Sequence, residues 1–297
     1  MYLLVMTSPY TLDNPDTYQR WRQQKLQNYP TDIQQLVISV KDATSLSLPE
    51  QQAIFSLINK TNMAIISAPN EVTSQTVTQL GSQVGLQHLD ANIYSNAEAV
   101  TALSVQNKPS RQQAFIPYTN KPIAWHTDGY YNPLNKQVLG MLLYCASPAA
   151  TGGMNHFIDP EIAYIHIRDT NPEFIRALFH PNAMLIPAHE NDGVTLRPAQ
   201  GGPVFSTING QLHMRYTHRK KSIEWHDSAI LKSALACLHE LFADGHPSQF
   251  QGTLASGQAL LCNNVLHNRT GFTETGEQTR LMFRGRYFDR VSSHAIS

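Results

Sequence analysis

The segment from Trp125 to Tyr131, W-H-T-D-G-Y-Y, places a histidine and an aspartate with one residue between them. Side chains alternate between the two faces of an extended strand, so His126 and Asp128 are expected on the same side. An imidazole and a carboxylate on one face can bind a single metal ion. Taken alone, however, such a pair more often forms a structural hydrogen bond at a strand end. A metal site therefore requires a further ligand from elsewhere in the chain.

His267, in N-N-V-L-H-N-R-T-G-F, supplies a candidate for that ligand. It is expected in a loop after an apolar strand, 141 residues beyond His126. Two histidines and a carboxylate form the facial triad typical of Fe(II) sites with open positions for oxygen and substrate. The same spacing also occurs in His88-Leu89-Asp90. That pair ends a helical pattern, and we interpret it as polar residues at a helix end.

Hydrophobic periodicity predicts a mainly β chain with some helices. Helical patterns cover residues 16–27, 50–59, 71–86, 160–179 and 227–242. Strand patterns cover residues 36–40, 63–67, 137–145, 155–158, 194–196, 204–208, 211–217, 258–262 and 279–288. This order predicts a double-stranded β-helix, or jelly-roll, core over about residues 113–290, with the N-terminal helices and strands packed on it. No linker, charge block or repeat divides the sequence, so residues 1–297 are expected to form a single domain.

Composition narrows the class of partner. Basic and acidic side chains number 22 each, which gives no reason to expect nucleic acid or a membrane as partner and favours a small molecule. The three cysteines are an odd number without close pairing, as expected of a reducing compartment, where they act as small buried hydrophobes. The apolar run at residues 1–6 is too short for a signal segment. We therefore predict a cytoplasmic protein, which is free to form oligomers.

Three arginines, Arg280, Arg284 and Arg286, fall at even positions of the predicted strand 279–288, where they alternate with apolar residues. Side chains at even positions of one strand share a face. A stripe of arginines on a solvated surface is one interpretation. The other is a barrel interior that binds a dicarboxylate, because a planar guanidinium takes a carboxylate in a bidentate pair.

These residues together resemble the Fe(II)/2-oxoglutarate-dependent dioxygenases of the TauD/TfdA type. The resemblance covers roughly residues 113–290. It implies that His126, Asp128 and His267 ligate Fe(II). It also implies that Arg280, thirteen residues beyond His267, binds the far carboxylate of 2-oxoglutarate. Asn155, after the Gly-Gly turn in T-G-G-M-N, would assist it, although relatives usually carry threonine or serine there.

The same resemblance suggests substrate contacts near the metal. Arg284 would meet an anionic group, as in taurine-type members, and Arg215 is a further candidate. Tyr130 and Tyr131 would either form an aromatic wall for a cation, as in butyrobetaine-type relatives, or simply pack at the strand end. We favour a small molecule that bears a carboxylate or sulfonate.

The predicted function is thus an oxygenase that uses Fe(II), 2-oxoglutarate and O2 to hydroxylate a C–H bond of a small polar molecule, with release of succinate and CO2. The aspartate ligand disfavours halogenation. Arg269 is interpreted as a brace behind the ligands, and Arg286 has no assigned role. Two alternatives remain open from the sequence: a cupin-like metal isomerase or hydrolase, and a non-catalytic small-molecule sensor on the same scaffold.

Overall fold

The computed structural model describes residues 8–91, 99–105, 115–191, 194–219, 221, 223–276 and 278–293. The N-terminal apolar run and the first residues of the predicted core, 113–114, lie outside these ranges. The helices are α1 (Pro15–Leu26), α2 (Leu48–Thr61), α3 (Ser74–Ser82), α4 (Pro160–Thr170), α5 (Pro172–Leu178) and α6 (Ala229–Glu240). None of the described helices is long and apolar enough to cross a membrane.

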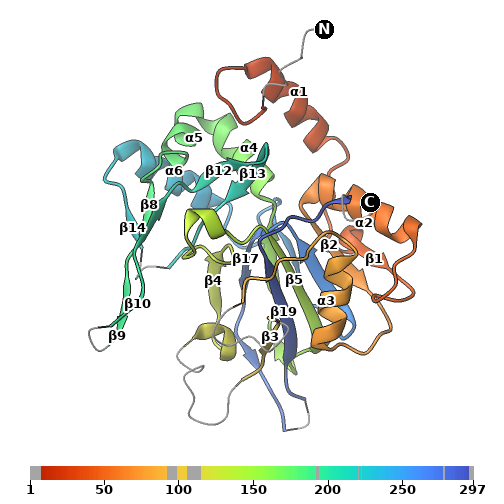
Figure 1. Ribbon diagram of the computed structural model, residues 1–297. Helices are drawn as coiled ribbons and strands as arrows, with labels where there is room; N and C mark the ends of the chain where they lie inside the picture. The colour runs from red at the N-terminus through yellow and green to blue at the C-terminus, as the bar shows by residue number, and fades with distance from the viewer. Residues whose placement is uncertain are drawn as a thin grey trace.

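The strands are short and numerous, and they give a mixed α/β fold (Figure 1). They are β1 (Val37–Ser39), β2 (Met63–Ser67), β3 (Thr101–Leu103), β4 (Ile123–His126), β5 (Gly140–Ser147), β6 (Thr151–Gly152), β7 (Asn155–Ile158), β8 (Met184–Ile186), β9 (His189–Asn191), β10 (Val194–Arg197), β11 (Gln200–Gly202), β12 (Phe205–Ile208), β13 (Gln211–Met214), β14 (Glu224–Trp225), β15 (Phe250–Gly252), β16 (Gln258–Cys262), β17 (Leu266–Arg269), β18 (Phe272–Thr273) and β19 (Leu281–Tyr287).

Two sheets carry the centre of the fold. The larger has the strand order β1-β2-β16-β5-β19-β3, and the smaller has the order β15-β7-β17-β4. One apolar cluster takes residues from both sheets, including Leu143 and Leu260 from the larger and Phe157 and Phe250 from the smaller. The two sheets therefore pack face to face around this cluster, which excludes water from the space between them.

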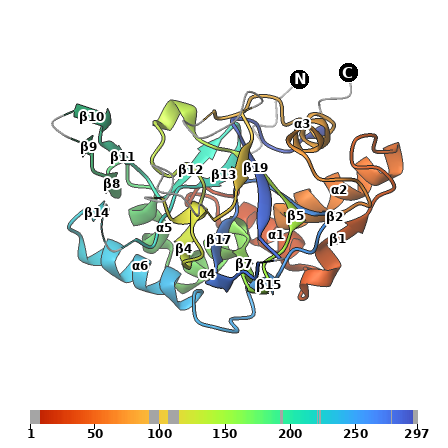
Figure 2. The ribbon, with the colours of Figure 1, turned by 90° about the horizontal axis from the view of Figure 1, so that it is seen from below.

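Helices cover the outer faces of both sheets. Ala259 and Leu261, the neighbours of inward-facing Leu260, pack with α2 and α3 on the far side of the larger sheet. Because β16 is buried on both faces, its sequence is a continuous apolar run rather than an alternating one. Helices α4, α5 and α6 and the hairpin β12–β13 form a second layer, which contacts Ile158 and Leu266 of the smaller sheet (Figures 1 and 2).

Most predicted elements are present, and two differ in an informative way. The helix predicted over 160–179 is divided at Asn171, which ends α4 and caps α5 by accepting a hydrogen bond from the Glu173 amide at 3.0 Å. Pro172 at the first helical position favours this new start. The predicted loop at His267 is wrong, because His267 lies within β17. The chain turns earlier, at Asn264, which has a φ of 50°.

A buried ion network attaches α1 to the start of α4. The Lys25 ammonium lies 2.7 Å from the Asp159 carboxylate and also pairs with Glu161. Tyr10 donates to Glu161, and Asn62 donates to Asp159 at 2.9 Å. Burial alone would lower the pKa of Lys25, but the two carboxylates outweigh that effect and raise it. The otherwise polar α1 is therefore held by a largely buried set of paired charges.

We predict that Lys25→Met lowers the free energy of unfolding by about 3–5 kcal/mol, because it leaves two carboxylates buried without their cation. Equilibrium denaturation in urea measures this. Lys232→Met is the control, since Lys232 forms an exposed ion pair with Asp227 and its loss should cost about 0–1 kcal/mol. Equal effects of the two substitutions would contradict the assigned role of the network.

Candidate active site

Strand pairing brings the two predicted histidine ligands together. β17 lies between β7 and β4, and its register places His267 directly opposite His126. The two rings lie 4.3 Å apart between centroids. Asp128 follows just beyond the end of β4, with its Oδ1 3.9 Å from the Nε2 of His126. One donor atom from each of the three side chains lies within 4.8 Å of the others, so the group has the dimensions of a metal site.

The backbone sets the tautomer of both histidines. The Nδ1 of His126 lies 2.9 Å from the carbonyl oxygen of Ala124, and the Nδ1 of His267 lies 2.9 Å from that of Val265. A carbonyl oxygen only accepts, so each Nδ1 carries the proton and donates it. The lone pair of each neutral ring is consequently on Nε2, which is the atom that faces the group. Burial lowers the pKa of His126 to about 3 and also lowers that of His267, so both rings are neutral.

Asp128 is a buried carboxylate held ionised by nearby cations. Its side chain accepts from the Nη1 of Arg284 at 3.2 Å to Oδ1 and 3.4 Å to Oδ2. Burial would raise the pKa of Asp128, but the charge of Arg284, reinforced by that of Arg286, lowers it well below the ordinary range. The site therefore combines one anionic oxygen donor with two neutral nitrogen donors.

Two residues beside Asp128 fix the path of its backbone. Gly129 has a φ of +66°, and a Cβ there would lie 2.5 Å from Cγ2 of Val138, so only glycine fits. Asn264 accepts from the Asp128 amide at 2.7 Å and donates to the carbonyl oxygens of Asp128 and Val138 at 2.9 and 2.6 Å. The sequence pattern did not predict this role of Asn264. Its only signal was an Asn-Asn pair between two apolar segments, where a turn is favoured.

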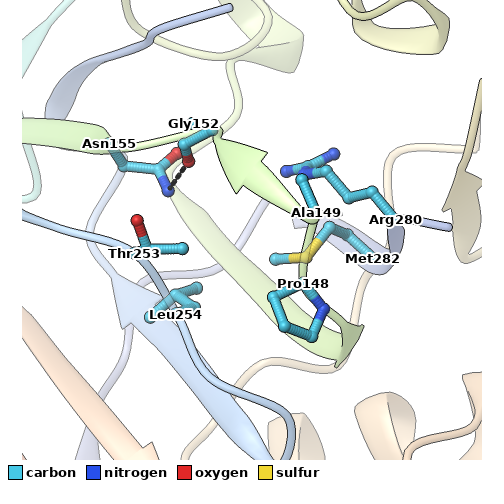
Figure 3. Close-up of a pocket in the computed structure, with 9 residues that line it drawn as sticks. Pro148, Ala149, Gly152, Asn155, Thr253, Leu254, Arg280 and Met282 are labelled. Atoms are coloured by element: carbon cyan, nitrogen blue, oxygen red, sulfur yellow. Dashed lines mark hydrogen bonds between the residues drawn. The ribbon is translucent and has the colours of Figure 1, made fainter. Parts of the chain in front are cut away.

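A small pocket lies at one end of the space between the sheets, and Arg280 and Asn155 both line it (Figure 3). Arg280 immediately precedes β19 and is 5% exposed. Within the described residues its guanidinium makes no salt bridge, and it lies 5.2 Å from the centroid of the Phe272 ring. Burial lowers the pKa of Arg280. A buried cation without a carboxylate partner is costly, so this pocket is suited to a carboxylate from outside the chain.

Arg269 supports this pocket from behind. Its guanidinium donates to the carbonyl oxygen of Thr119 at 2.9 Å and to that of Lys121, and it lies 4.7 Å from the Phe272 ring centroid. Burial, together with the charge of Arg280, lowers its pKa to about 9. These contacts hold the backbone of residues 119–121 against β17.

The segment after Asp128 is held by arginines. The Tyr131 hydroxyl accepts from Arg286 at 2.7 Å, and the same guanidinium forms a salt bridge with Asp90 at 2.7 Å. Asp90 belongs to the second histidine–aspartate pair, and its partner His88 contacts Asp289 instead. Within the described residues, Asp90 therefore contacts Arg286 in β19, and His88 contacts Asp289, two residues after the end of β19. The sequence pattern did not predict the contact between Arg286 and Asp90, because the two residues lie far apart in the chain.

Tyr130 is held by two further arginines. Its carbonyl oxygen accepts from the Nε of Arg215 at 2.7 Å, and its hydroxyl accepts from Arg219 at 3.3 Å. Arg215 is buried and also donates to the carbonyl oxygen of Gln200 at 2.8 Å, while its Nη1 is buried without a hydrogen-bond partner within the described part of the chain. Arg215 therefore positions the tyrosine segment and adds positive charge beside it.

Comparison with known proteins identifies the family of this chain. Residues 23–286 match the family described as taurine catabolism dioxygenase TauD, TfdA family. The chain belongs to this family. Its members are dioxygenases that use Fe(II), 2-oxoglutarate and O2, so this protein is a 2-oxoglutarate-dependent dioxygenase.

Individual relatives are distant. A uridine-5′-phosphate dioxygenase from a Streptomyces species is 25% identical over 202 residues, which are 65% of this chain and 70% of that protein. The structure of the non-heme iron oxygenase OrfP with iron and alpha-ketoglutaric acid has a TM-score of 0.61 at 15% identity, covering 83% of this chain and 82% of that one. An asparagine oxygenase with Fe(II), 2S,3S-3-hydroxyasparagine and succinate has a TM-score of 0.58 at 12% identity, covering 82% and 81%. These structures share the fold.

We predict that Asn264→Ala weakens binding of Fe(II) or Co(II) at the histidine–aspartate group by roughly 10- to 100-fold, because Asp128 loses the side chain that fixes its backbone. Isothermal titration calorimetry with the metal ion measures this affinity. Asn263→Ala is the matched control: Asn263 is also buried, but its side chain contacts Asn62 and Val291 rather than Asp128. Loss of metal affinity in both variants alike would contradict a specific role for Asn264.

Proposed function

We propose that this dioxygenase binds Fe(II) through His126, Asp128 and His267 and hydroxylates a C–H bond of a small polar molecule. The observation that carries the proposal is the shared tautomer of the two histidines, each with its Nδ1 proton donated to a carbonyl oxygen and its Nε2 lone pair toward Asp128. A merely structural histidine–aspartate pair would use an N–H to donate to the carboxylate. Here both free lone pairs and an ionised carboxylate converge, a donor set that suits Fe(II).

Bound Fe(II) would supply the activation of O2 that couples oxidation of the substrate to conversion of 2-oxoglutarate into succinate and CO2. The residues of this chain supply position and charge. The apolar cluster between the sheets keeps water away from the site, and Arg284 balances the negative charge of Asp128. The fixed imidazole tautomers mean that neither histidine has to lose a proton when the metal binds.

For 2-oxoglutarate, we propose that Arg280 binds the far carboxylate and that Asn155 assists. Both line the pocket between the sheets, and Arg280 has no salt bridge among the described residues. The Asn155 side-chain amide donates to the carbonyl oxygen of Gly153 at 3.3 Å, which leaves its oxygen and second N–H for other partners. An asparagine therefore supplies the donor that threonine or serine supplies elsewhere in the family.

The architecture around this site supports the proposal of a jelly-roll core within a single domain. The smaller sheet is entirely antiparallel in its described pairings, and it faces β5 and its two antiparallel neighbours, β16 and β19. One apolar cluster fills the space between the sheets. Ligands from β4 and β17 and arginines on β19 all reach this interior, as a barrel of this type requires.

For the substrate, we propose a small molecule with an acidic group such as a carboxylate or sulfonate. The half-buried Arg284 and the buried Arg286 lie near Asp128, and Arg215 adds another buried cation behind Tyr130. Acidic partners are fewer than arginines here, since Asp128 and Asp90 are the carboxylates paired with them. A negatively charged substrate would restore the balance. A relative named for uridine-5′-phosphate as its substrate is consistent with this preference.

Tyr130 and Tyr131 form the adjoining wall. Their rings meet edge to face with 5.2 Å between centroids. Arg286 and Arg197 each lie 5.9 Å from the centroid of the Tyr131 ring. With cations already close to this ring, we propose that the tyrosine pair contacts the apolar or aromatic part of an anionic substrate rather than a quaternary ammonium group.

We predict that Arg280→Leu raises the KM for 2-oxoglutarate at least about tenfold, because a charge-assisted carboxylate contact is lost. Succinate formation at increasing 2-oxoglutarate measures this. Affinity for Fe(II) or Co(II) should stay unchanged, which separates the effect from a general loss of structure. Unchanged 2-oxoglutarate KM with full activity would contradict the assignment of Arg280.

We predict that Arg284→Ala strongly raises the KM for an acidic substrate while succinate formed in the absence of substrate changes little. Removing a cation beside Asp128 favours metal binding, so loss of metal cannot explain the increase. Arg284→Lys keeps the charge and should recover part of the affinity. Succinate assays with a panel of carboxylated, sulfonated, phosphorylated and neutral compounds provide the measurement. A neutral preferred substrate would overturn the proposed preference.

A further inference from the structure

A second group of metal-binding side chains lies outside the proposed active site, between α4 and α6. We propose that His166, Cys237 and Glu240 form a second divalent-metal site of the zinc type. One donor atom of each residue lies within 4.8 Å of the other two. The inference concerns a different part of the molecule from the proposed function and does not depend on it.

The helices explain why these residues meet. Cys237 and Glu240 are three residues apart on α6 and therefore lie on the same face of that helix. α4 packs against α6 in the apolar layer and presents His166 to this face. The Nε2 of His166 lies 3.4 Å from the Glu240 carboxylate. His239, the neighbour of Glu240, points elsewhere and contacts the Tyr216 hydroxyl at 2.7 Å.

The burial and hydrogen bonding of the three donor side chains favour a metal site over a simple ion pair between His166 and Glu240. The His166 Nε2 is buried and has no hydrogen-bond partner in the described residues, although its carboxylate neighbour lies nearby. Cys237 is 3% exposed, and burial raises the pKa of its thiol. The side chain of Glu240 is 66% exposed, which gives an ion a route from solvent. Metal binding would release the Cys237 proton to solvent and convert the thiol into a thiolate ligand.

The mixture of donors indicates the metal. One imidazole nitrogen, one sulfur and one carboxylate oxygen suit Zn(II), and also Co(II) as its substitute, better than Mg(II) or Ca(II), which prefer oxygen alone. Three protein ligands leave the fourth tetrahedral position for water.

His246 is the nearest further imidazole, but its tautomer opposes ligation. Its ring centroid lies 6.0 Å from that of His166. However, its Nδ1 accepts a hydrogen bond from the Ser248 amide at 3.1 Å. The proton of the neutral ring is therefore on Nε2, the reverse of the arrangement at His126 and His267, and we do not include it among the ligands.

An ion at this position would connect the helical layer to the strand that carries the first catalytic histidine. It would tie α4 to the last turn of α6. Just beyond that turn, Phe242 stacks on Trp125 with 5.1 Å between ring centroids. Trp125 immediately precedes His126 in β4. A metal ion bound at the proposed site would thus stabilise the layer on which β4 rests.

The test uses full-length protein in which the proposed iron site is removed by His126→Ala and His267→Ala. Titration with Co(II) should show about one bound equivalent, together with a thiolate-to-cobalt charge-transfer band in the near ultraviolet. Zn(II) should displace the cobalt and abolish the band. The iron site contains no cysteine and cannot produce this band. Absence of Co(II) and Zn(II) binding, or binding without the band, would overturn the proposal.

Substitutions in the same background identify the ligands. Cys237→Ser should abolish the band, whereas its persistence would mean that another cysteine is responsible and would refute the site. Because Cys237 is buried, its replacement can affect folding, so Glu240→Gln provides a second test at an exposed position. It should weaken Zn(II) binding by roughly tenfold or more. Glu173→Gln, on the exposed surface of α5, is the matched control and should leave Zn(II) affinity unchanged. Equal affinities of these two variants would also overturn the proposal.

Discussion

The pairing of β17 with β4 is the interaction on which the active site depends. It places His267 opposite His126, although the two residues lie far apart in the chain. The same extended backbone provides the carbonyl oxygens that accept from each Nδ1, so the strand geometry fixes both the position and the tautomer of the rings. Ala124 lies within β4 and Val265 directly precedes β17, so the pairing of these two strands sets the position of both carbonyl groups. The donor set is therefore organised before any metal arrives.

Charge balance is the second constraint. Arginines on and next to β19 bring several cations into an interior that apolar side chains otherwise fill. Asp128 and Asp90 compensate two of them, and backbone carbonyl groups solvate others, as at Arg215 and Arg269. Burial lowers the pKa of Arg280, the charge of nearby Glu274 offsets that effect only in part, and the guanidinium forms no salt bridge within the described residues. Burying such a cation is costly unless a ligand supplies the missing negative charge, so the charge distribution favours binding of an anionic cosubstrate near Arg280.

Much of the fold was predictable because local patterns dominate it. Apolar runs such as the one ending at Cys262 predicted buried strands. The three cysteines are free and buried, as their spacing indicated. Prediction failed where one residue decided a boundary. Asn171 divides a helical pattern because its side chain caps the next helix, and Asn264 turns the chain early enough for His267 to join a strand.

The sequence by itself determined the chemistry: two histidines and an aspartate with the spacing of a triad, and an arginine at the expected distance beyond. Residue type and spacing suffice for this, since strand periodicity is local. Only the tertiary structure brings the predicted pair, His126 and Asp128, together with His267. His126 and Asp128 meet His267 through strand pairing, whereas His88 and Asp90 form ion pairs with Asp289 and Arg286. Contacts between segments so distant in the chain depend on sheet register and packing, which no local pattern encodes.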